Sequence, residues 1–189
     1  MKLRRLIAVT VAASVAAFSL AACGNKEKET TFGPTEGSYL NVGNLAYQVQ
    51  ISRLLNPNDN EDKAYLVDLP ADQRELGPDQ AWFAVFIVGF NEGKNPQQGV
   101  TDFKITDTQG NVYEPIQPGP DNVFAYRAGT LDPGQTDPEQ DTAARNNPSV
   151  NGSMLLFKVN NSTFDNRPLQ LTLHSLSGSP QDATVDLDV

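Results

Sequence analysis

Apolar and polar residues alternate one for one along several short runs of this chain. In residues 45–52 the odd positions are apolar and the even positions are small or polar, the apolar ones being Leu45, Tyr47, Val49 and Ile51. Because successive side chains of a β-strand point to opposite faces, this alternation predicts a strand with one buried face. No segment shows the 3.6-residue spacing of a convincing amphipathic helix. The chain is therefore expected to fold from strands.

Six further segments have strand character. The most apolar is residues 81–90, AWFAVFIVGF, which is rich in β-branched and aromatic side chains on both faces. A strand of this kind belongs at the centre of a sheet that is covered on both sides. The remaining segments are residues 103–107, 112–114, 154–159, 169–174 and 185–189. Gly110 predicts a hairpin turn between residues 103–107 and 112–114.

These seven strands, joined by turn-rich segments, predict an all-β fold. An antiparallel β-sandwich of two sheets is the expected architecture, and a closed barrel is the alternative. With 189 residues and 39% hydrophobic side chains, the chain has material for one such domain. Residues 56–80 and 117–152 do not fit as strands and predict two long loops. Loops of this length are uncommon unless they are functional or locally packed.

The N-terminus has the layout of an export signal. Lys2, Arg4 and Arg5 precede an apolar run at residues 6–20, and no acidic residue interrupts it. A helix over that run would span about 22 Å, which is short of the roughly 30 Å hydrocarbon core of a membrane. The pattern therefore predicts a signal peptide at residues 1–22 rather than a permanent membrane span.

Residues 23–37 follow the apolar run and predict an N-terminal flexible linker. They are mostly polar, alternate Lys with Glu, and show neither helical nor strand periodicity. Such a composition gives a flexible tether with a reach of about 20 Å, which exceeds the screening length of about 8 Å at physiological salt. We therefore expect the folded domain at residues 38–189, standing clear of the membrane surface.

The segment Leu20-Ala21-Ala22-Cys23 ends the apolar run and resembles the lipobox of bacterial lipoprotein precursors. The resemblance implies cleavage before Cys23 and attachment of diacylglycerol to its thiol. Two or three acyl chains hold a protein stably on a membrane, so the resemblance implies a chain anchored at the cell membrane, on its extracytoplasmic face. The alternative is a soluble secreted protein cut after Ala22, in which the cysteine is incidental.

A second resemblance covers roughly residues 38–175. Its motifs are a hydrophobic strand running into Asn91, then Asp102-Phe103, Ile105, Asp107, Gly110 and Tyr113, then Leu131-Asp132-Pro133-Gly134, and Gly152 with Leu156, Phe157 and Val159. The series resembles the immunoglobulin-like domain of unknown function common on bacterial lipoproteins, which is similar in fold to secreted mycobacterial-antigen-type β-sandwich proteins. The chain departs from that pattern in the acidic stretch 58–62 and the proline-rich stretch 134–152. The resemblance implies a surface-held immunoglobulin-like sandwich with no assigned reaction.

Acidic residues outnumber basic residues by 23 to 14, which gives a formal net charge of −9. Cleavage before Cys23 would remove three positive charges and leave the mature chain at −12. This balance argues against nucleic acid as a partner, because phosphate binding needs clustered Lys and Arg. One Cys and one His also exclude a disulfide framework and most zinc sites, and no cofactor is expected.

Few residues show a pattern for chemistry. His174, the single histidine, takes a polar position of a predicted strand, and no G-x-S-x-G motif supplies a nucleophile, so a solvent-facing side chain is expected. Asn58, Asn60 and Asp62 have the spacing of oxygen ligands in calcium loops. However, Lys63 stands where such loops have glycine, which favours a solvated acidic turn. A calcium-stabilised structural module and an envelope-polymer hydrolase with an acid pair from the long loops are the alternatives.

One segment of the second long loop offers candidate contact residues. Phe124, Tyr126 and Arg127 combine two aromatic rings with a guanidinium group, and Tyr and Arg are favoured at protein interfaces. The structural alternative is that this segment lies over the open end of the sandwich and plugs it. We expect a monomeric binding or interaction module without catalytic activity, whose loops or sheet edge contact an envelope protein or glycan.

Overall fold

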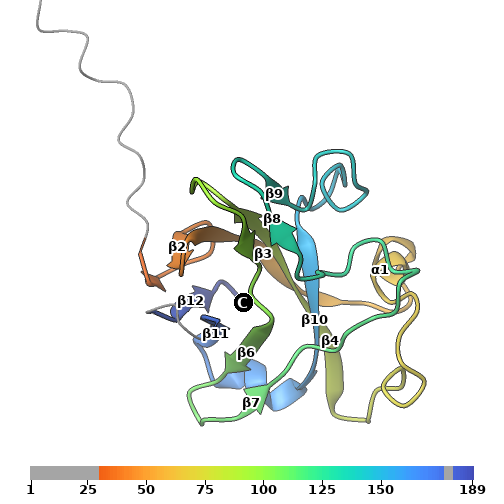
Figure 1. Cartoon of the computed structure of the whole chain (residues 1–189). Helices are drawn as coiled ribbons and strands as arrows, with labels where there is room; N and C mark the ends of the chain where they lie inside the picture. Colours follow the sequence, from red (N-terminus) through yellow and green to blue (C-terminus); the bar gives the residue numbers. More distant parts are fainter. Residues whose placement is uncertain (1–29, 177–180) are drawn as a thin grey trace, which may run out of the picture.

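Two β-sheets pack face to face in the computed structural model, which describes residues 30–176 and 181–189 (Figure 1). The first, the β4 sheet, has the order β10-β4-β3-β2 and consists of β2 (Tyr39–Val42), β3 (Leu45–Leu55), β4 (Gln80–Phe90) and β10 (Ser153–Asn160). The second, the β11 sheet, has the order β1-β12-β11-β6-β7 and consists of β1 (Phe32–Gly33), β6 (Asp102–Thr106), β7 (Val112–Tyr113), β11 (Leu169–His174) and β12 (Ala183–Leu187).

Short elements complete the fold. Strand β9 (Thr136–Asp137) pairs with the end of β4, and β5 (Gln97–Gln98) pairs with β8 (Thr130–Leu131). Helix α1 (Asn60–Tyr65) and the 3₁₀ helix η1 (Asn161–Asp165) are brief. Neither helix, nor any other in the described ranges, has the length and apolar character needed to cross a membrane.

The expected all-β sandwich is confirmed, and all seven predicted strands are present. The described residues contain twelve strands rather than about seven. The five additional strands, β1, β2, β5, β8 and β9, have two to four residues each. A two-residue strand cannot display a period of two, and the alternation of β2 covers only four residues, which is too short a run to stand out. The pairing of β1 with β12 is parallel, so the sandwich is not antiparallel throughout.

Strand β4 lies between two hydrophobic cores. The inner core fills the space between the two sheets and contains its odd-numbered side chains Phe83, Val85 and Ile87. The outer core lies on the other side of the β4 sheet and contains the even-numbered Trp82, Ala84 and Phe86. The prediction of a central strand covered on both sides is therefore confirmed, since residues 82–88 are all buried.

Strand β3 contains a β-bulge at Gln50. Val49 pairs with Ile87, and the next paired residue is Ile51, which pairs with Phe86. Because Ile87 faces the inner core and Phe86 the outer core, the extra residue moves Ile51 to the opposite face from Val49. The predicted placement of these two side chains on one face is wrong. Ile51 is instead 38% exposed on the outer side.

The two predicted long loops cover the outer face of the β4 sheet. Residues 56–80 include α1, which Asp59 caps with its carboxylate and whose last residue, Tyr65, is fully buried. Residues 117–152 contribute Val150 and other side chains to the outer core. These segments are thus locally packed, which is one of the two conditions under which long loops occur.

The outer edge of β10 is closed by backbone hydrogen bonds. The amide of Ile116 donates to the carbonyl of Leu156 at 2.7 Å. Further along, the amide of Met154 donates to the carbonyl of Phe124 at 2.7 Å, and the amide of Tyr126 donates to the carbonyl of Met154 at 2.8 Å. Because these bonds occupy the edge, β10 does not offer a row of unpaired groups for strand addition by a partner.

Residues 30–37, expected in the linker, belong to the sandwich. Thr30 exchanges two backbone hydrogen bonds with β2, at 3.1 and 2.8 Å. The carboxylate of Glu36 accepts hydrogen bonds from the amides of Ser52, at 3.1 Å, and Asp188, at 3.2 Å, and so connects the two sheets. The fold therefore starts before residue 38. The polar composition misleads here because backbone pairing and one carboxylate, rather than apolar side chains, hold the segment.

Candidate functional site

Tyr126 is a core residue rather than a surface contact. Its side chain is 6% exposed, and its ring lies 5.2 Å from that of Phe103 in an edge-to-face arrangement. Its hydroxyl donates to the carbonyl of Val100 at 2.8 Å. The structural alternative, in which this segment plugs the sandwich, describes Tyr126 well.

Arg127 and Phe124 remain on the surface but point to different places. The guanidinium of Arg127 donates to the carbonyl oxygens of Pro118 and Gly119, which fixes the turn beside it. Phe124 is half-buried, and its ring lies 4.9 Å from that of Tyr65. The three predicted contact residues therefore do not form one surface. Only Phe124 reaches a large depression.

That depression, here called the α1 groove, lies between α1 and residues 143–149 and has a volume of about 420 Å³. This volume is within the range of 300–1,000 Å³ typical of ligand sites. Its apolar lining consists of Ala64, Tyr65, Phe124, Ala143 and Pro148. Ala64 and Ala143 are exposed, so the groove is bounded on two sides by small side chains.

The floor of the α1 groove is a stack of aromatic rings that continues into the outer core. The Tyr65 ring lies between Phe124, at 4.9 Å, and Phe86, at 5.1 Å, and both contacts are edge-to-face. The guanidinium of Arg53 lies 5.6 Å from the Tyr65 ring centroid. Burial raises the pKa of the Tyr65 hydroxyl above its usual value. The aromatic rings of the floor are therefore uncharged at neutral pH.

The polar groups at the rim are mostly engaged within the protein. Asn147 donates from its amide to the Tyr65 hydroxyl at 2.8 Å and accepts from the amide of Ser149 at 2.9 Å. Asn146 donates to two backbone carbonyls, at 2.7 and 3.0 Å. Glu61 is the charged residue of the rim; its side chain is 50% exposed, and its carboxylate lies 3.7 Å from the guanidinium of Arg53. A ligand in the groove would therefore meet mainly apolar surface and the carboxylate of Glu61, and few free hydrogen-bonding groups.

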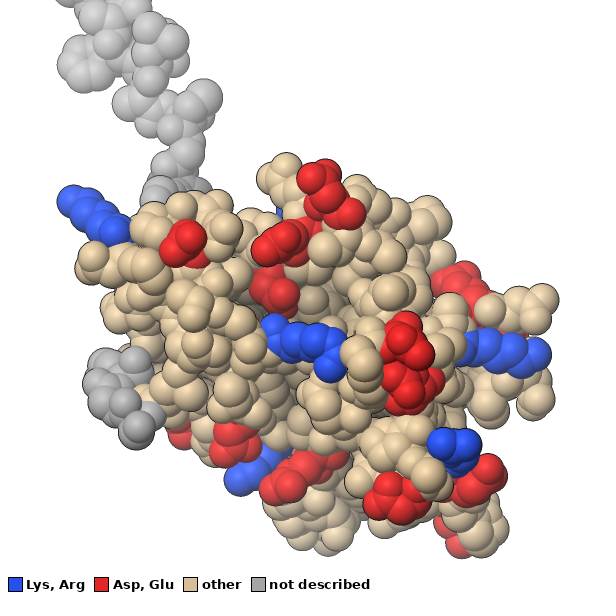
Figure 2. Space-filling view, turned by 45° about the vertical axis from the view of Figure 1, so that its right-hand side comes forward, with Lys and Arg blue, Asp and Glu red and all other residues tan. Residues whose placement is uncertain are grey.

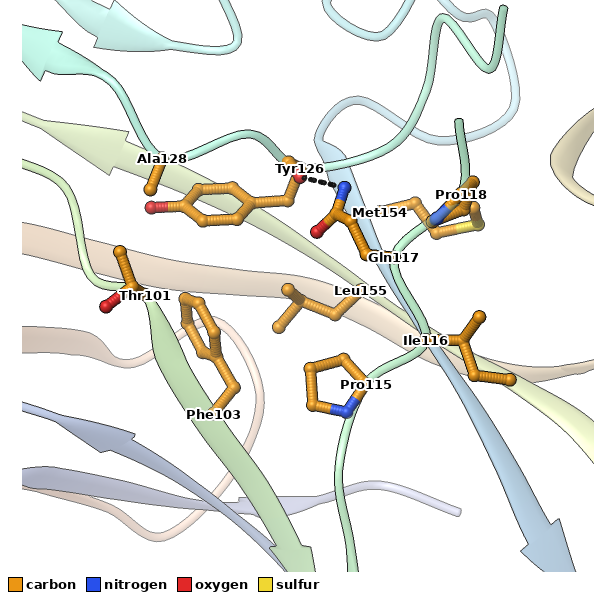
Figure 3. Close-up of a pocket in the computed structure, with 10 residues that line it drawn as sticks. All are labelled: Thr101, Phe103, Pro115, Ile116, Gln117, Pro118, Tyr126, Ala128, Met154 and Leu155. Carbon is orange, nitrogen blue, oxygen red and sulfur yellow. Dashed lines mark hydrogen bonds between the residues drawn. The ribbon is translucent and has the colours of Figure 1, made fainter. Parts of the chain in front are cut away.

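A smaller space, here called the Gln117 cavity, lies between the edges of the two sheets (Figure 3). Its volume is about 140 Å³. Phe103 of β6, Leu155 of β10 and the ring of Tyr126 form its walls, and the exposed Gln117 lies at its mouth. No pattern in the sequence singles out Gln117.

A buried polar cluster lies near the start of β10. The hydroxyl of Tyr47 accepts from the amide of Val100 at 2.8 Å and lies 3.4 Å from the hydroxyl of Tyr126. Close by, burial raises the pKa of the Asp137 carboxyl to about 6, although a hydrogen bond with Ser153 opposes the shift. The Oδ2 atom of Asp137 is buried and has no hydrogen-bond partner among the described residues.

His174 is partly exposed and pairs with a carboxylate. Its Nδ1 atom lies 2.9 Å from Oδ2 of Asp182, whose Oδ1 accepts from the amide of Ser175 at 2.8 Å. These contacts lower the pKa of Asp182, the backbone hydrogen bond from Ser175 being the largest cause. These contacts join the end of β11 to the start of β12.

The predicted lipidation site, Cys23, lies outside the described residues.

The residues with calcium-loop spacing do not share a centre. Asp62 is buried, and its carboxylate accepts from the guanidinium of Arg53 and from the amide of Asn56, the latter at 2.7 Å. Asn58 and Asn60 are exposed. In the described part of the chain, no group of three or more His, Cys, Asp and Glu side chains is placed to hold a metal ion.

The carboxylates of Asp107 and Asp62 have structural roles. Asp107, which is 4% exposed, accepts from the amides of Gln109 and Asn111, each at 2.9 Å, and so holds the hairpin turn after β6. Asp62 holds α1 against β3 through its bond to Arg53. These two residues occupy different elements, and neither provides the acid pair that the hydrolase alternative requires.

Charged side chains of both signs are spread over the face that carries α1. Figure 2 shows acidic and basic groups interspersed on this face, with no continuous basic surface. The protein as a whole is acidic, with 23 acidic against 14 basic side chains. Cationic groups of a partner would therefore meet a net negative surface.

Comparison with known proteins concerns the fold alone. No protein-family model matches the chain, and no curated protein matches its sequence. A functionally unknown protein from Listeria monocytogenes shares 10% sequence identity with a TM-score of 0.50, over 83% of this chain and 84% of that one. An uncharacterised β-sandwich protein from Clostridium difficile shares 11% identity with a TM-score of 0.43, over 87% and 99%. The candidate lipoprotein ycdA of Bacillus subtilis shares 16% identity with a TM-score of 0.46, over 79% of this chain and 38% of its own length.

Proposed function

We propose that this protein is a lipid-anchored binding module at the extracytoplasmic face of the cell membrane, which recognises a protein partner through the α1 groove and catalyses no reaction. The anchor follows from the lipobox-like segment Leu20-Ala21-Ala22-Cys23. The binding site is supported by one observation, a groove of about 420 Å³ with an aromatic floor on the outer face of the β4 sheet.

The chemistry of the groove favours a protein over a glycan. A sugar needs several hydrogen-bonding groups, and the amides of Asn146 and Asn147 already donate to protein acceptors. An apolar side chain could instead rest on Phe124 and Tyr65, while a neighbouring Lys or Arg of the partner reached the carboxylate of Glu61. A basic segment with one apolar anchor residue fits both features and the acidic charge of the domain.

The binding role is tested by filling the groove. A photo-crosslinking amino acid at Ala64, in the full chain in cells, should form an adduct with a protein partner. Ala143→Trp should abolish the adduct, since it places a large ring in the groove from the opposite wall. Ala71→Trp, at another exposed alanine outside the groove lining, is the matched control and should leave the adduct unchanged. An adduct that survives Ala143→Trp, or one formed with a glycan, would contradict the assignment.

The anchor is tested separately. Cys23→Ser should abolish incorporation of labelled palmitate and shift the chain from the detergent phase to the aqueous phase. The groove experiment and the acylation experiment fail independently, because the first depends on residues of the outer layer and the second on the N-terminal segment. Continued palmitate labelling of the Cys23→Ser chain would overturn the anchor.

A further inference from the structure

The Gln117 cavity lies at a seam that no strand closes. On one side is β10, the last strand of the β4 sheet, and on the other is β6 of the β11 sheet. The seam is crossed by residues 115–118 and by residues 126–128, which line the cavity together with the two strands. The space therefore lies between the sheets, on a different part of the molecule from the α1 groove.

The walls of this cavity are held in place. Ile116 is bonded to Leu156 at 2.7 Å, and Pro115 and Pro118 on either side of it have fixed φ angles. Tyr126 is fixed at both ends, through its amide to Met154 and through its hydroxyl to Val100, each at 2.8 Å. The segments across the seam cannot collapse inward without breaking these bonds. The cavity is thus preformed, as ligand sites usually are.

The lining defines what the cavity can hold. Phe103, Leu155 and the face of Tyr126 present apolar surface, and the Tyr126 hydroxyl is directed away to Val100. Gln117 donates from Nε2 to the carbonyl of Tyr126 at 3.3 Å, and Figure 3 shows its Oε1 atom turned toward the space beside Leu155. The cavity therefore combines apolar walls with the amide oxygen of Gln117 as an acceptor, and Thr101 is the other polar side chain among the lining residues.

Size sets the class of ligand. The volume of about 140 Å³ is close to that of engineered apolar cavities of about 150 Å³ that take up a single benzene ring. We infer that the Gln117 cavity binds a small single-ring aromatic molecule that carries one hydrogen-bond donor, such as a phenol, with the ring against Phe103, Leu155 and Tyr126 and the donor on Oε1 of Gln117. This site is independent of the α1 groove and of the membrane anchor.

The inference is tested with 4-fluorophenol, followed by ¹⁹F NMR on the purified full chain with a detergent-only blank. We expect saturable binding with a dissociation constant on the order of 0.1–1 mM, a reasonable affinity for a ligand of this size. Ala128→Leu, which fills the cavity, should weaken binding at least tenfold. Ala64→Trp, which fills the α1 groove instead, should leave it unchanged. No saturable binding, or binding that Ala128→Leu does not reduce, would overturn the site.

The role of Gln117 has its own measurement. Gln117→Leu keeps the size of the side chain but removes the acceptor, and the exposed position makes misfolding of the variant a small concern. It should weaken 4-fluorophenol about tenfold, which corresponds to one hydrogen bond. Fluorobenzene, which has no donor, should bind the wild type and this variant equally. An equal loss for both probes would show that Gln117 only shapes the cavity and would overturn the assignment of the acceptor.

Discussion

The two faces of β4 are equally buried but are covered by different means. On the inner side, Phe83 and Ile87 pack against strands of the β11 sheet. On the outer side, Phe86 packs against Tyr65 at the end of a short helix and against irregular segments. Both proposed sites involve the irregular segments, and neither lies between regular strands alone. In this molecule the sheets carry most of the packed core, and the irregular segments that cover them form the two proposed sites.

The largest effect should distinguish the two cores directly. Phe83→Ala leaves a hole between two sheets that cannot close, and should lower the free energy of unfolding by about 4 kcal/mol. Phe86→Ala should cost less, about 3 kcal/mol, because the segment that carries Tyr65 can settle into the space. Urea unfolding of the two variants measures both values. Equal losses, or a larger loss for Phe86→Ala, would show that the outer layer is as rigid as the inner one.

Asp137 allows a test by pH at the end of the β4 sheet. Burial raises its pKa from 3.8 to about 6, so the folded protein holds this proton more tightly than the unfolded chain does. The contribution of Asp137 to stability is therefore fully present below about pH 4 and is lost as the pH rises through 6, a change of roughly 2–3 kcal/mol. Asp137→Asn should remove this part of the pH dependence and stabilise the protein at pH 7.5.

Unfolding free energies of wild type and Asp137→Asn between pH 4 and 8 provide the measurement. Asp141→Asn, which changes an exposed carboxylate, serves as the control and should leave the curve as it is in the wild type. Parallel curves for wild type and Asp137→Asn would mean that this carboxyl titrates in the folded protein as it does in the unfolded chain.

A smaller effect concerns the outer layer alone. Tyr65→Phe removes the hydroxyl that accepts from Asn147 and should cost about 1 kcal/mol. The change should appear mainly as faster hydrogen exchange in residues 143–149, since those residues form the opposite wall of the α1 groove. Faster exchange spread over β4 and β10 would instead indicate that the groove wall and the sheets open as one unit.

The smallest expected effect is that of calcium. The carboxylate of Asp62 is occupied by Arg53 and Asn56, so an ion would have to displace a guanidinium. Thermal unfolding in millimolar CaCl₂ and in chelator should therefore give the same midpoint. A higher midpoint with calcium would show that the folded protein binds the ion and would favour the calcium-stabilised alternative.

The inner core is the part of the fold that sequence patterns predict well. Alternation finds β10 and β11 because each buries a face of several residues, and Leu169, Leu171 and Leu173 illustrate this, whereas β4 is found by its continuous apolar and β-branched character. The bulge at Gln50 is not visible in the sequence. The alternation of apolar and polar residues continues through it, although the side chains after Gln50 point to the opposite face of the sheet. The rule of alternation is local, and such a shift depends on the partner strand.

The candidate sites are less accessible to sequence reasoning. Phe124 lines the α1 groove, but its neighbours in that groove are separated from it by about twenty residues or more along the chain. Helix α1 has only six residues, too few to show a helical period, so Tyr65 reads as part of a loop. Tyr126 shares every compositional feature of a contact residue, and only its position between the sheets shows that it is buried.

The N-terminal segment has a mechanical consequence. Residues 30–37 are bonded to β2 in one sheet and to β12 in the other, and Glu36 joins β3 to the end of the chain. Tension arriving along the backbone ahead of Thr30 is thus divided between both halves of the sandwich instead of peeling away a single strand. A domain pulled at this point would share the load between its two sheets.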